Sequence, residues 1–339
     1  MNTLYITTPD AYLSLDGENV VVLKEEVQLL RVPMHNLESI ITFGYTGASP
    51  ALMGACAKKG IAVSFCTAYG RFLAQVAGEQ QGNVLLRRTQ YRIADDNERS
   101  LKIARNMLIG KLYNSRWVIN RAIRDHPQRV DVEKLKRVEG YIKNSIHQIQ
   151  EAQDYETLMG VEGEAASRYF SVFDDLILQN KDSFYFRQRS RRPPLDNINA
   201  LLSFIYTILS FDAASAASAV GLDPFVGFLH KDRPGRRSLA LDLMEELRAP
   251  IADRFVLTII NKRQIDGSGF EQRENGSVYL KDDARKVVLN AWQENKHEVI
   301  THPFLNEKVE RGLIPYVQAL LLARCLRGDL DAYPPLLYK

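Results

Sequence analysis

The first quarter of the chain alternates short apolar runs with turn residues, which is the pattern of β-strands joined by tight connections. Asp16 and Gly17 lie between two of these runs, and this dipeptide favours a hairpin. Ser49 and Pro50 then predict the start of a short helix that ends at Gly60. Strands are expected over residues 4–7, 11–15, 20–23, 27–32, 39–43, 61–66 and 71–76.

Beyond residue 82 the apolar residues recur at the spacing of an α-helix, as at Leu101, Leu108 and Val118. The segment 266–277 is rich in Gly, Ser and charged residues, which indicates a loop or a short hairpin. Besides the helix through Leu101, helices are expected over residues 132–151, 164–179, 196–220, 224–229, 239–262, 281–294 and 303–328.

The change of period divides the chain into parts. The expected fold class is α+β, with a small N-terminal antiparallel β domain followed by a larger all-helical domain that carries the chemistry. A length of 339 residues also suits roughly two domains. The expected divisions are a β domain over residues 1–80, a linker over 81–98, a helical domain over 99–332 and a flexible tail over 333–339.

Composition excludes several classes of protein. An apolar fraction of 45% and a charged fraction of 25% are ordinary for a globular protein. No run of eighteen apolar residues predicts a membrane span, and the N-terminus lacks the pattern of a signal peptide. Three cysteines without a C-x-x-C pair argue against a disulfide framework and a structural zinc site. We therefore expect a reducing, cytoplasmic location.

The net charge of +3 is small, but the basic residues are concentrated. Residues 81–137 hold fourteen Lys and Arg against six Asp and Glu. Two further blocks, 181–192 and 231–237, hold five and four basic residues against one acid each. Such blocks suit a polyanion such as nucleic acid, although each alone could be a solvated helix face.

The segment from Asp223 to Glu246 carries the strongest candidate chemistry. A short helix over 224–229 is expected to end near His230, and the next helix to begin after Ser238. Asp242 and Glu245 are three residues apart, so their carboxylates share one helix face. An imidazole with one or two carboxylates could bind Mn²⁺, Mg²⁺ or Zn²⁺. The alternative is a helix N-terminus favoured by acidic residues, beside a surface histidine.

Two further segments also have both a functional and a purely structural interpretation. Glu162 lies between Gly160 and Gly163 just before a predicted helix, where close backbone approach could bring its carboxylate into a cleft. It could equally be an acid that complements a helix dipole. Arg191 and Arg192 precede two prolines, and they form either a phosphate-docking cluster or a basic linker.

Taken together and in order, these segments resemble the Cas1 family of CRISPR-associated endonucleases and integrases. The resemblance runs through the whole chain, and the residues of these segments are most similar to the type I-C subtype. The segments are VEGEAASRYF at 161–170, RPPLDNINALLS at 192–203, GLDPFVGFLH at 221–230 and SLALDLMEE at 238–246.

The resemblance implies a metal-dependent DNA endonuclease and integrase of CRISPR adaptation, which joins the 3′-hydroxyl ends of short foreign DNA to the repeat array by transesterification. It implies that Glu162, His230 and Glu245 hold Mg²⁺ or Mn²⁺, with Asp242 as an additional acid. Tyr169 would stack or hydrogen-bond near the scissile strand, or pack in the core. The expected DNA-binding residues are Arg87, Arg88, Arg92, Arg189, Arg191, Arg192, Arg233, Arg236 and Arg237.

The resemblance also implies partners. These are double-stranded DNA as prespacer and as CRISPR repeat, a second copy of the chain bound through the β domain, a small Cas2 partner and a Cas4 nuclease. Two alternatives of other classes stay open: a non-catalytic nucleic-acid-binding scaffold, and an unrelated metal hydrolase with a small substrate. Affinity for Mn²⁺ would argue against the first, and salt-sensitive DNA binding would argue against the second.

Overall fold

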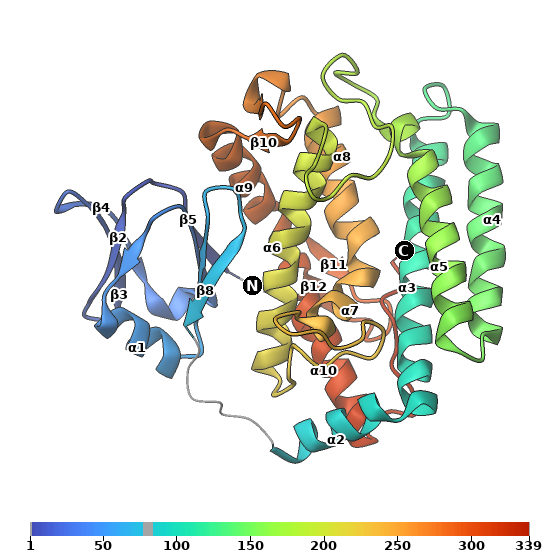
Figure 1. Cartoon of the computed structure of the whole chain (residues 1–339), viewed down its shortest axis with the longest axis horizontal. Helices are drawn as coiled ribbons and strands as arrows, with labels where there is room; N and C mark the ends of the chain where they lie inside the picture. Colours follow the sequence, from blue (N-terminus) through green and yellow to red (C-terminus); the bar gives the residue numbers. More distant parts are fainter. Residues whose placement is uncertain (1, 77–83, 339) are drawn as a thin grey trace.

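The computed structural model describes residues 2–76 and 84–338. Strands gather in an N-terminal part, and helices make up most of the larger C-terminal part (Figure 1). The expected α+β architecture is therefore confirmed. The helical part also contains two short hairpins, and one of them overlaps the segment 266–277, where a loop or hairpin is expected.

The N-terminal part consists of two four-stranded sheets. The first has the order β1 (Thr3–Ile6), β5 (Ser39–Phe43), β7 (Ala62–Cys66) and β8 (Phe72–Val76). The second has the order β4 (Val27–Pro33), β3 (Asn19–Lys24), β2 (Tyr12–Asp16) and β6 (Gly47–Ala48).

The expectation of mostly antiparallel pairing holds for β2, β3 and β4 but is wrong for the first sheet. There β1, β5 and β7 are parallel, and only β8 is antiparallel. Parallel neighbours need a crossover connection, and α1 (Pro50–Lys58) supplies it between β5 and β7. Ser49 caps α1 by accepting a hydrogen bond from Leu52 N at 3.1 Å.

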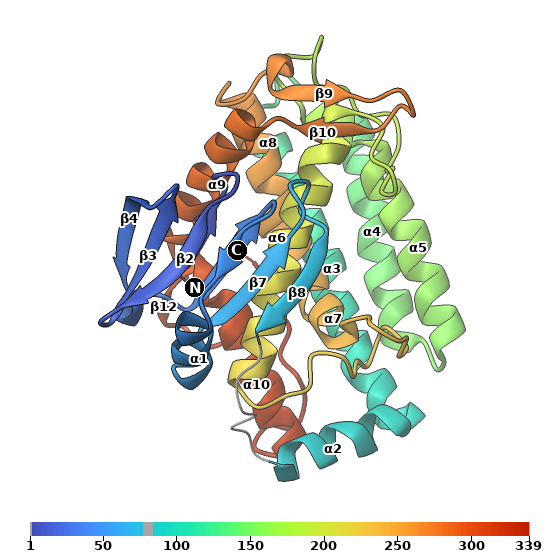
Figure 2. The same cartoon turned by 60° about the vertical axis from the view of Figure 1, so that its left-hand side comes forward.

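Two apolar cores meet at the first sheet. Side chains such as Leu13, Ile40 and Val63 are buried inside the N-terminal part. Phe43 on β5 instead belongs to the core of the helical part, where its ring lies 5.7 Å from that of Phe204 on α6 (Asn197–Ala219). Figure 2 shows β7 and β8 alongside α6. The sheet is therefore packed against the central helix.

The helical part is built around α6, which is mostly buried. Of the helices that the structure describes, α6 alone passes a length and composition test for a membrane span, but 72% of that window is buried in the protein, as befits a core helix. Around it lie α2 (Val84–Asp95), α3 (Asn97–Asp125), α4 (Val132–Glu151), α5 (Tyr155–Ser171), α7 (Ser238–Leu247), η3 (Arg248–Asp253), α8 (Arg254–Asn261), α9 (Asp282–Lys296) and α10 (Ile314–Arg327).

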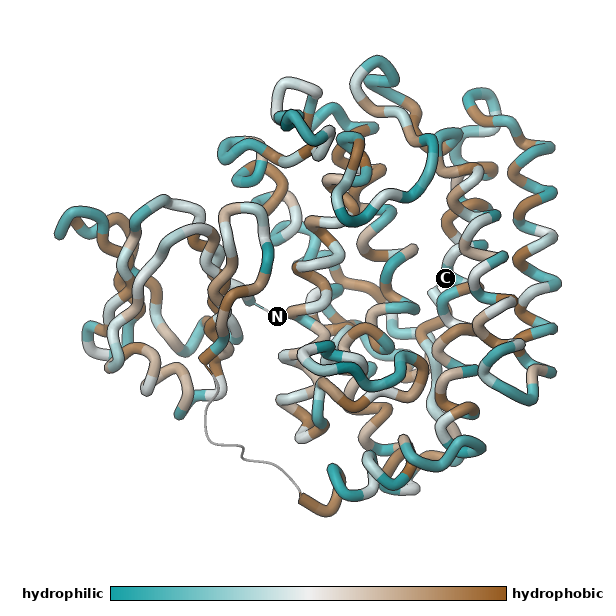
Figure 3. Tube along the Cα trace, in the orientation of Figure 1, coloured by the Kyte–Doolittle hydropathy of each residue, from teal (hydrophilic) through white to brown (hydrophobic). Residues whose placement is uncertain are grey.

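The helix α4 has the bounds that its sequence predicts. Asp131 caps it by accepting a hydrogen bond from Lys134 N at 2.9 Å. Apolar and polar residues alternate along this helix (Figure 3), and Leu135, Ile142 and Ile149 are fully buried. This amphipathic face packs α4 against α3 and α5.

Besides the helix expected over 164–179, which begins at Tyr155 and ends at Ser171, three helix expectations are wrong, each for a local reason. The predicted helix 239–262 is interrupted by the π-helical turn η3, which contains Pro250, a residue without an N–H to donate. The predicted helix 303–328 begins at Ile314, because β11 (Val299–Thr301) and β12 (Lys308–Glu310) form a hairpin first. The predicted helix 224–229 does not form, and its replacement shapes the candidate site.

The ends of the helical part also differ from expectation. In the predicted linker 81–98, residues 81–83 lie outside the described residues and most of the remainder forms α2. The tail predicted to be flexible is packed along residues 333–338, with Tyr333 and Leu336 buried. The amide of Tyr338 donates to Asn114 Oδ1 at 2.8 Å. Apolar residues and buried hydrogen bonds thus hold the tail against α3.

Candidate active site

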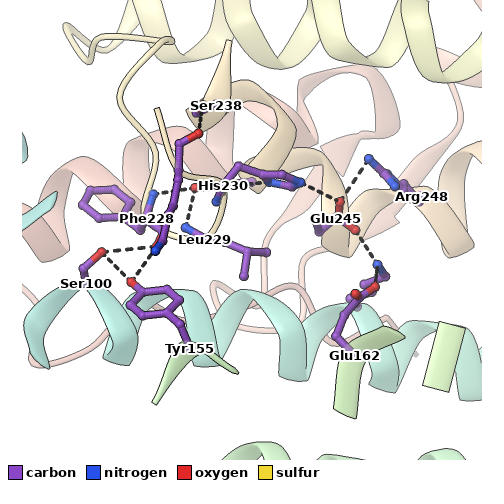
Figure 4. Close-up of polar contacts among 12 residues, drawn as sticks. Ser100, Tyr155, Glu162, Phe228, Leu229, His230, Ser238, Glu245 and Arg248 are labelled. Carbon is purple, nitrogen blue, oxygen red and sulfur yellow. Dashed lines mark hydrogen bonds and ion pairs between the residues drawn. The ribbon is translucent and has the colours of Figure 1, made fainter. Parts of the chain in front are cut away.

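Elements from separate parts of the sequence bring charged side chains together. Lys111 lies in the middle of α3, Glu162 in the middle of α5, Glu245 in the last turn of α7 and Arg248 at the start of η3. His230 comes from the segment before α7. Figure 4 shows the side chains of His230, Glu162 and Arg248 directed toward Glu245.

Asp242 organises the segment that carries His230. Its Oδ2 accepts hydrogen bonds from the backbone amides of Phe228 at 2.6 Å and Leu229 at 2.9 Å. Its Oδ1 accepts from the amide of His230 at 2.9 Å and lies 2.7 Å from His230 Nδ1. Because these amides bond to a side chain, no helix forms over 224–229. Both carboxylate oxygens are thereby used, and the side chain is fully buried.

The contact with Asp242 fixes the role of the imidazole. An ionised carboxylate can only accept, so Nδ1 donates this hydrogen bond, and in a neutral imidazole the lone pair is then on Nε2. His230 Nε2 lies 3.9 Å from Glu245 Oε1. The structure therefore places Asp242 behind the histidine, and the expectation that it is an additional acid at the metal is not supported.

Glu245 is surrounded by positive charge. Lys111 Nζ lies 2.7 Å from its Oε2, and Arg248 Nη2 lies 3.0 Å from its Oε1. Burial alone would raise the pKa of Glu245, but the charges of Arg248 and Lys111 outweigh it and lower the pKa to about 2. Glu245 is therefore ionised at neutral pH although it is only 3% exposed.

Lys111 bridges the two glutamates. Its ammonium donates a hydrogen bond to Glu162 Oε1 and also forms an ion pair with Glu245. Burial disfavours the ammonium, yet Glu245 and Glu162 raise the pKa of Lys111 above its ordinary value. Among the described residues, no three His, Cys, Asp or Glu side chains form a ready set of metal ligands. The Lys111 ammonium lies between the two glutamates, in the position that a metal ion shared by their carboxylates would take.

The donors nevertheless fit a divalent cation. Glu245 Oε2 is buried, and among the described residues its one charged partner is the Lys111 ammonium at 2.7 Å. Carboxylate oxygens with one neutral imidazole nitrogen are ligands that Mn²⁺ and Mg²⁺ accept. A cation beside Glu162, Glu245 and His230 would take over the charge that Lys111 supplies.

Glu162 reaches this cluster by another route than the sequence suggests. It lies inside α5 and not before a helix, because Asp154 caps the helix nine residues earlier than expected, accepting from Thr157 N at 2.7 Å. A Cβ added at Gly160 or Gly163 would meet nothing within 4 Å. Close backbone approach is therefore not what these glycines provide.

Tyr169 packs in the core, which is one of its two expected roles. It is 4% exposed, and its hydroxyl donates to Asp253 Oδ2 at 3.1 Å. Tyr206 donates to the other oxygen at 2.5 Å, and Arg248 stacks 5.1 Å from the Tyr206 ring. A side chain held in this way cannot stack on a DNA strand. It supports the arginine beside Glu245 instead.

The predicted DNA-binding arginines divide into two groups. Arg189 donates to Asn199 and Ser203, and Arg237 lies 4.4 Å from the Phe72 ring, so both take part in packing. Arg87 donates to a backbone carbonyl and Arg236 is partly buried. The exposed members are Arg88, Arg92, Arg191, Arg192 and Arg233.

Two of the basic blocks lie close together. On α2, Gln90 donates to the carbonyls of Asp223 and Val226 at 2.9 and 2.8 Å, and Tyr91 donates to Asp223 at 2.8 Å. These bonds fasten α2 to the segment that precedes the loop 231–237. Basic residues from separate parts of the sequence thus lie near the segment that carries His230.

Sequence reasoning missed Lys111 and Arg248. Lys111 interrupts the buried face of α3, where Ala104, Leu108 and Ser115 recur at helical spacing. A charged residue on such a face is the signal that could have identified it. Arg248 follows Glu245 by three residues, which is the spacing of an ion pair on a helix.

Comparison with known proteins gives this geometry a family. The family model described as CRISPR associated protein Cas1 matches residues 4–294. The endonuclease Cas1 1 of Chlorobaculum tepidum is 50% identical over 100% of this chain and 99% of its own. The endonuclease Cas1 2 of Rhodospirillum rubrum is 50% identical over the same shares. A Cas4/Cas1 fusion from Geobacter sulfurreducens is 33% identical over 98% of this chain and 59% of its own.

Solved structures share the fold. A casposase bound to its integration product has a TM-score of 0.85 at 22% identity, covering 100% of this chain and 95% of that one. A Cas6-RT-Cas1–Cas2 complex has a TM-score of 0.80 at 22% identity, covering 98% of this chain and 36% of that one. The family model and the 50% identical relatives match nearly the whole chain, and we conclude that this protein belongs to the Cas1 family of CRISPR-associated endonucleases.

Proposed function

We propose that the protein is a metal-dependent DNA endonuclease and integrase of CRISPR adaptation, which joins 3′-hydroxyl ends of short foreign DNA to the repeat array by transesterification in the cytoplasm. Membership of the Cas1 family supports the adaptation role. The observation that carries the proposal is that Glu162 and Glu245 share the ammonium of Lys111, while His230 Nε2 lies 3.9 Å from Glu245. A site that already stabilises one cation between two carboxylates is suited to another.

Glu162, Glu245 and the free Nε2 of His230 would hold Mg²⁺ or Mn²⁺. When bound, the ion would polarise the scissile phosphate and stabilise the leaving oxygen. Glu245 needs no deprotonation to serve as a ligand, because its neighbours lower its pKa to about 2. Asp242 keeps the proton of His230 on Nδ1, which leaves Nε2 free to coordinate.

The exposed arginines would hold the DNA backbone. Arg88 and Arg92 on α2 and Arg233 in the loop 231–237 come from two blocks that α2 joins near His230. Arg191 and Arg192 are exposed in the segment before α6. Phosphate contacts of this kind position a duplex without reading its sequence, as joining DNA of arbitrary origin requires.

The N-terminal part would provide the homodimer contact. Strand β4 is an edge strand, and Val27, Leu29 and Leu30 on it are 63%, 50% and 43% exposed. An exposed apolar edge strand is a template for pairing with another chain. A Cas2 partner and a Cas4 nuclease are proposed on the strength of the Cas1–Cas2 complex and the Cas4/Cas1 fusion among the similar proteins.

The test is strand transfer of a short duplex into a repeat-containing plasmid with Mg²⁺ or Mn²⁺. Glu245→Gln and His230→Ala are expected to abolish transfer. Glu164→Gln is the matched control, because Glu164 lies on the same helix as Glu162 and its side chain is 56% exposed. Full activity of either site variant would refute the assignment. Salt-sensitive DNA binding without Mn²⁺ affinity or transfer would favour the non-catalytic scaffold.

A further inference from the structure

A cavity lies away from the candidate active site. It has a volume of about 430 Å³ and is lined by the C-terminal half of α3, the turn η3 and α8. The C-terminal ends of α3 and α8 lie in the upper part of Figure 1. Pockets of about 300–1,000 Å³ hold small molecules. None of Lys111, Glu162, His230 and Glu245 lines it. It is therefore a separate site.

The lining of this cavity is strongly basic. Five cationic side chains face two carboxylates, which gives the cavity a net charge of +3. Both carboxylates are already paired, Asp125 with Arg121 at 3.2 Å and Glu298 with Arg311 at 2.7 Å. The cations are Arg121, Arg129, Arg254, Lys262 and Arg311.

Arg254 is one of the cations of this lining that no carboxylate pairs with directly. Its guanidinium lies 5.1 Å from the ring of Trp117, but it makes no hydrogen bond or ion pair with any residue of the described ranges. Burial and the neighbouring charges of Arg121 and Arg311 lower the pKa of Arg254. Arg311 Nε is also buried without a partner among those residues. An anion in the cavity would relieve this repulsion and supply the missing acceptors.

Apolar side chains make up another part of the wall. Leu176, Pro250, Ile251, Phe255 and Leu257 contribute to the lining. Inorganic phosphate alone would leave this wall in contact with water. The favoured ligand therefore combines a phosphate group with a flat, largely apolar body.

We propose that this cavity binds a phosphorylated nucleoside, with its phosphate on Arg254 and Arg121 and its base against the apolar wall. The same chemistry is offered by a free nucleotide and by the 5′-phosphorylated end of a DNA strand. Two guanidiniums in one site suit a phosphate monoester, because each can donate two hydrogen bonds to its oxygens.

The experiment is calorimetric titration of the full chain in EDTA, which removes any contribution of a bound metal ion. Deoxyadenosine 5′-monophosphate is expected to bind at least about tenfold more tightly than deoxyadenosine, which lacks the charge-assisted hydrogen bonds. Arg254→Met should weaken nucleotide binding about tenfold. Arg327→Met is the matched control, since Arg327 is exposed on α10 and outside the cavity. Glu245→Gln should not change nucleotide binding.

A second variant fills the cavity without altering its charge. Ala122→Phe is expected to abolish nucleotide binding while thermal unfolding confirms that the variant folds. Oligonucleotides with and without a 5′-phosphate identify the source: a preference for the phosphorylated oligonucleotide that Arg254→Met removes indicates a strand end, and binding of the mononucleotide alone indicates a free nucleotide. The proposal is overturned if neither the mononucleotide nor the 5′-phosphorylated oligonucleotide binds. It is also overturned if binding is the same in Arg254→Met and in Ala122→Phe as in the unaltered protein, whatever the strand-transfer assay shows.

Discussion

Replacing Lys111 with methionine tests whether its ammonium occupies the position of a cation. The change keeps a long side chain but removes the charge between Glu162 and Glu245. At 2.7 Å and an effective dielectric constant of about 20, the attraction to Glu245 alone is about 6 kcal/mol before desolvation is counted. Removing one partner of a buried ion pair costs about 3–5 kcal/mol. We expect the lower end, about 3 kcal/mol, since Arg248 still faces Glu245.

The expected results have opposite signs for folding and for metal binding. In EDTA, Lys111→Met should lower the free energy of unfolding by about 3 kcal/mol. A divalent cation should restore this loss, so Mn²⁺ affinity should rise up to about 100-fold. Urea unfolding measures the first quantity, and calorimetry with Mn²⁺ measures the second.

A control variant separates this effect from a general loss of charge. Lys102 lies on the same helix, and its pair with Glu98 is exposed. Lys102→Met is expected to change neither quantity appreciably, because exposed ion pairs contribute little. If Lys111→Met binds Mn²⁺ no more tightly than the unaltered protein does, then Lys111 does not compete for the cation position and the reasoning fails.

Three further predictions concern stability and assembly. Burial raises the pKa of Asp253 to about 6, so its contribution to stability is greatest below its ordinary pKa and declines as the pH rises toward 6. Asp253→Asn should flatten this decline in urea unfolding at pH 4, 5 and 7, and an unchanged slope would contradict it. Leu30→Lys on the β4 edge should convert a dimer into a monomer in light scattering, whereas an unaltered mass would exclude this edge as the contact. Tyr333→Phe removes a buried hydrogen bond to Glu246 and should lower the free energy of unfolding by about 1–2 kcal/mol. An unchanged melting temperature would show that this bond does not anchor the tail.

Local signals predicted most of the secondary structure. Ser49 and Asp131 are helix caps within short sequence windows, and the helices that they cap begin at the next residue. The strand direction in the first sheet depends on which strands become neighbours, and a short window does not contain that information. The bonds from Asp242 to the amides of residues 228–230 also override local propensity.

The candidate site, too, can be predicted only in part from the sequence. Three of the four segments named for the resemblance contain Glu162, His230 and Glu245, and the fold brings these side chains together. Lys111, which pairs with both glutamates, comes from a helix outside those four segments. Its role depends on the packing of α3 against α5 and α7, which spacing within one helix does not reveal. The burial of Tyr169 likewise follows from Asp253, which is 84 residues away.

The four contacts that Asp242 makes have a consequence for how the surrounding surface can vary. These contacts order the imidazole when the chain folds, so binding of a ligand includes no further loss of its conformational entropy. The loop that follows takes part in none of these four contacts, and its residues 231–235 are exposed. Substitutions can therefore accumulate in this loop while the orientation of His230 is preserved.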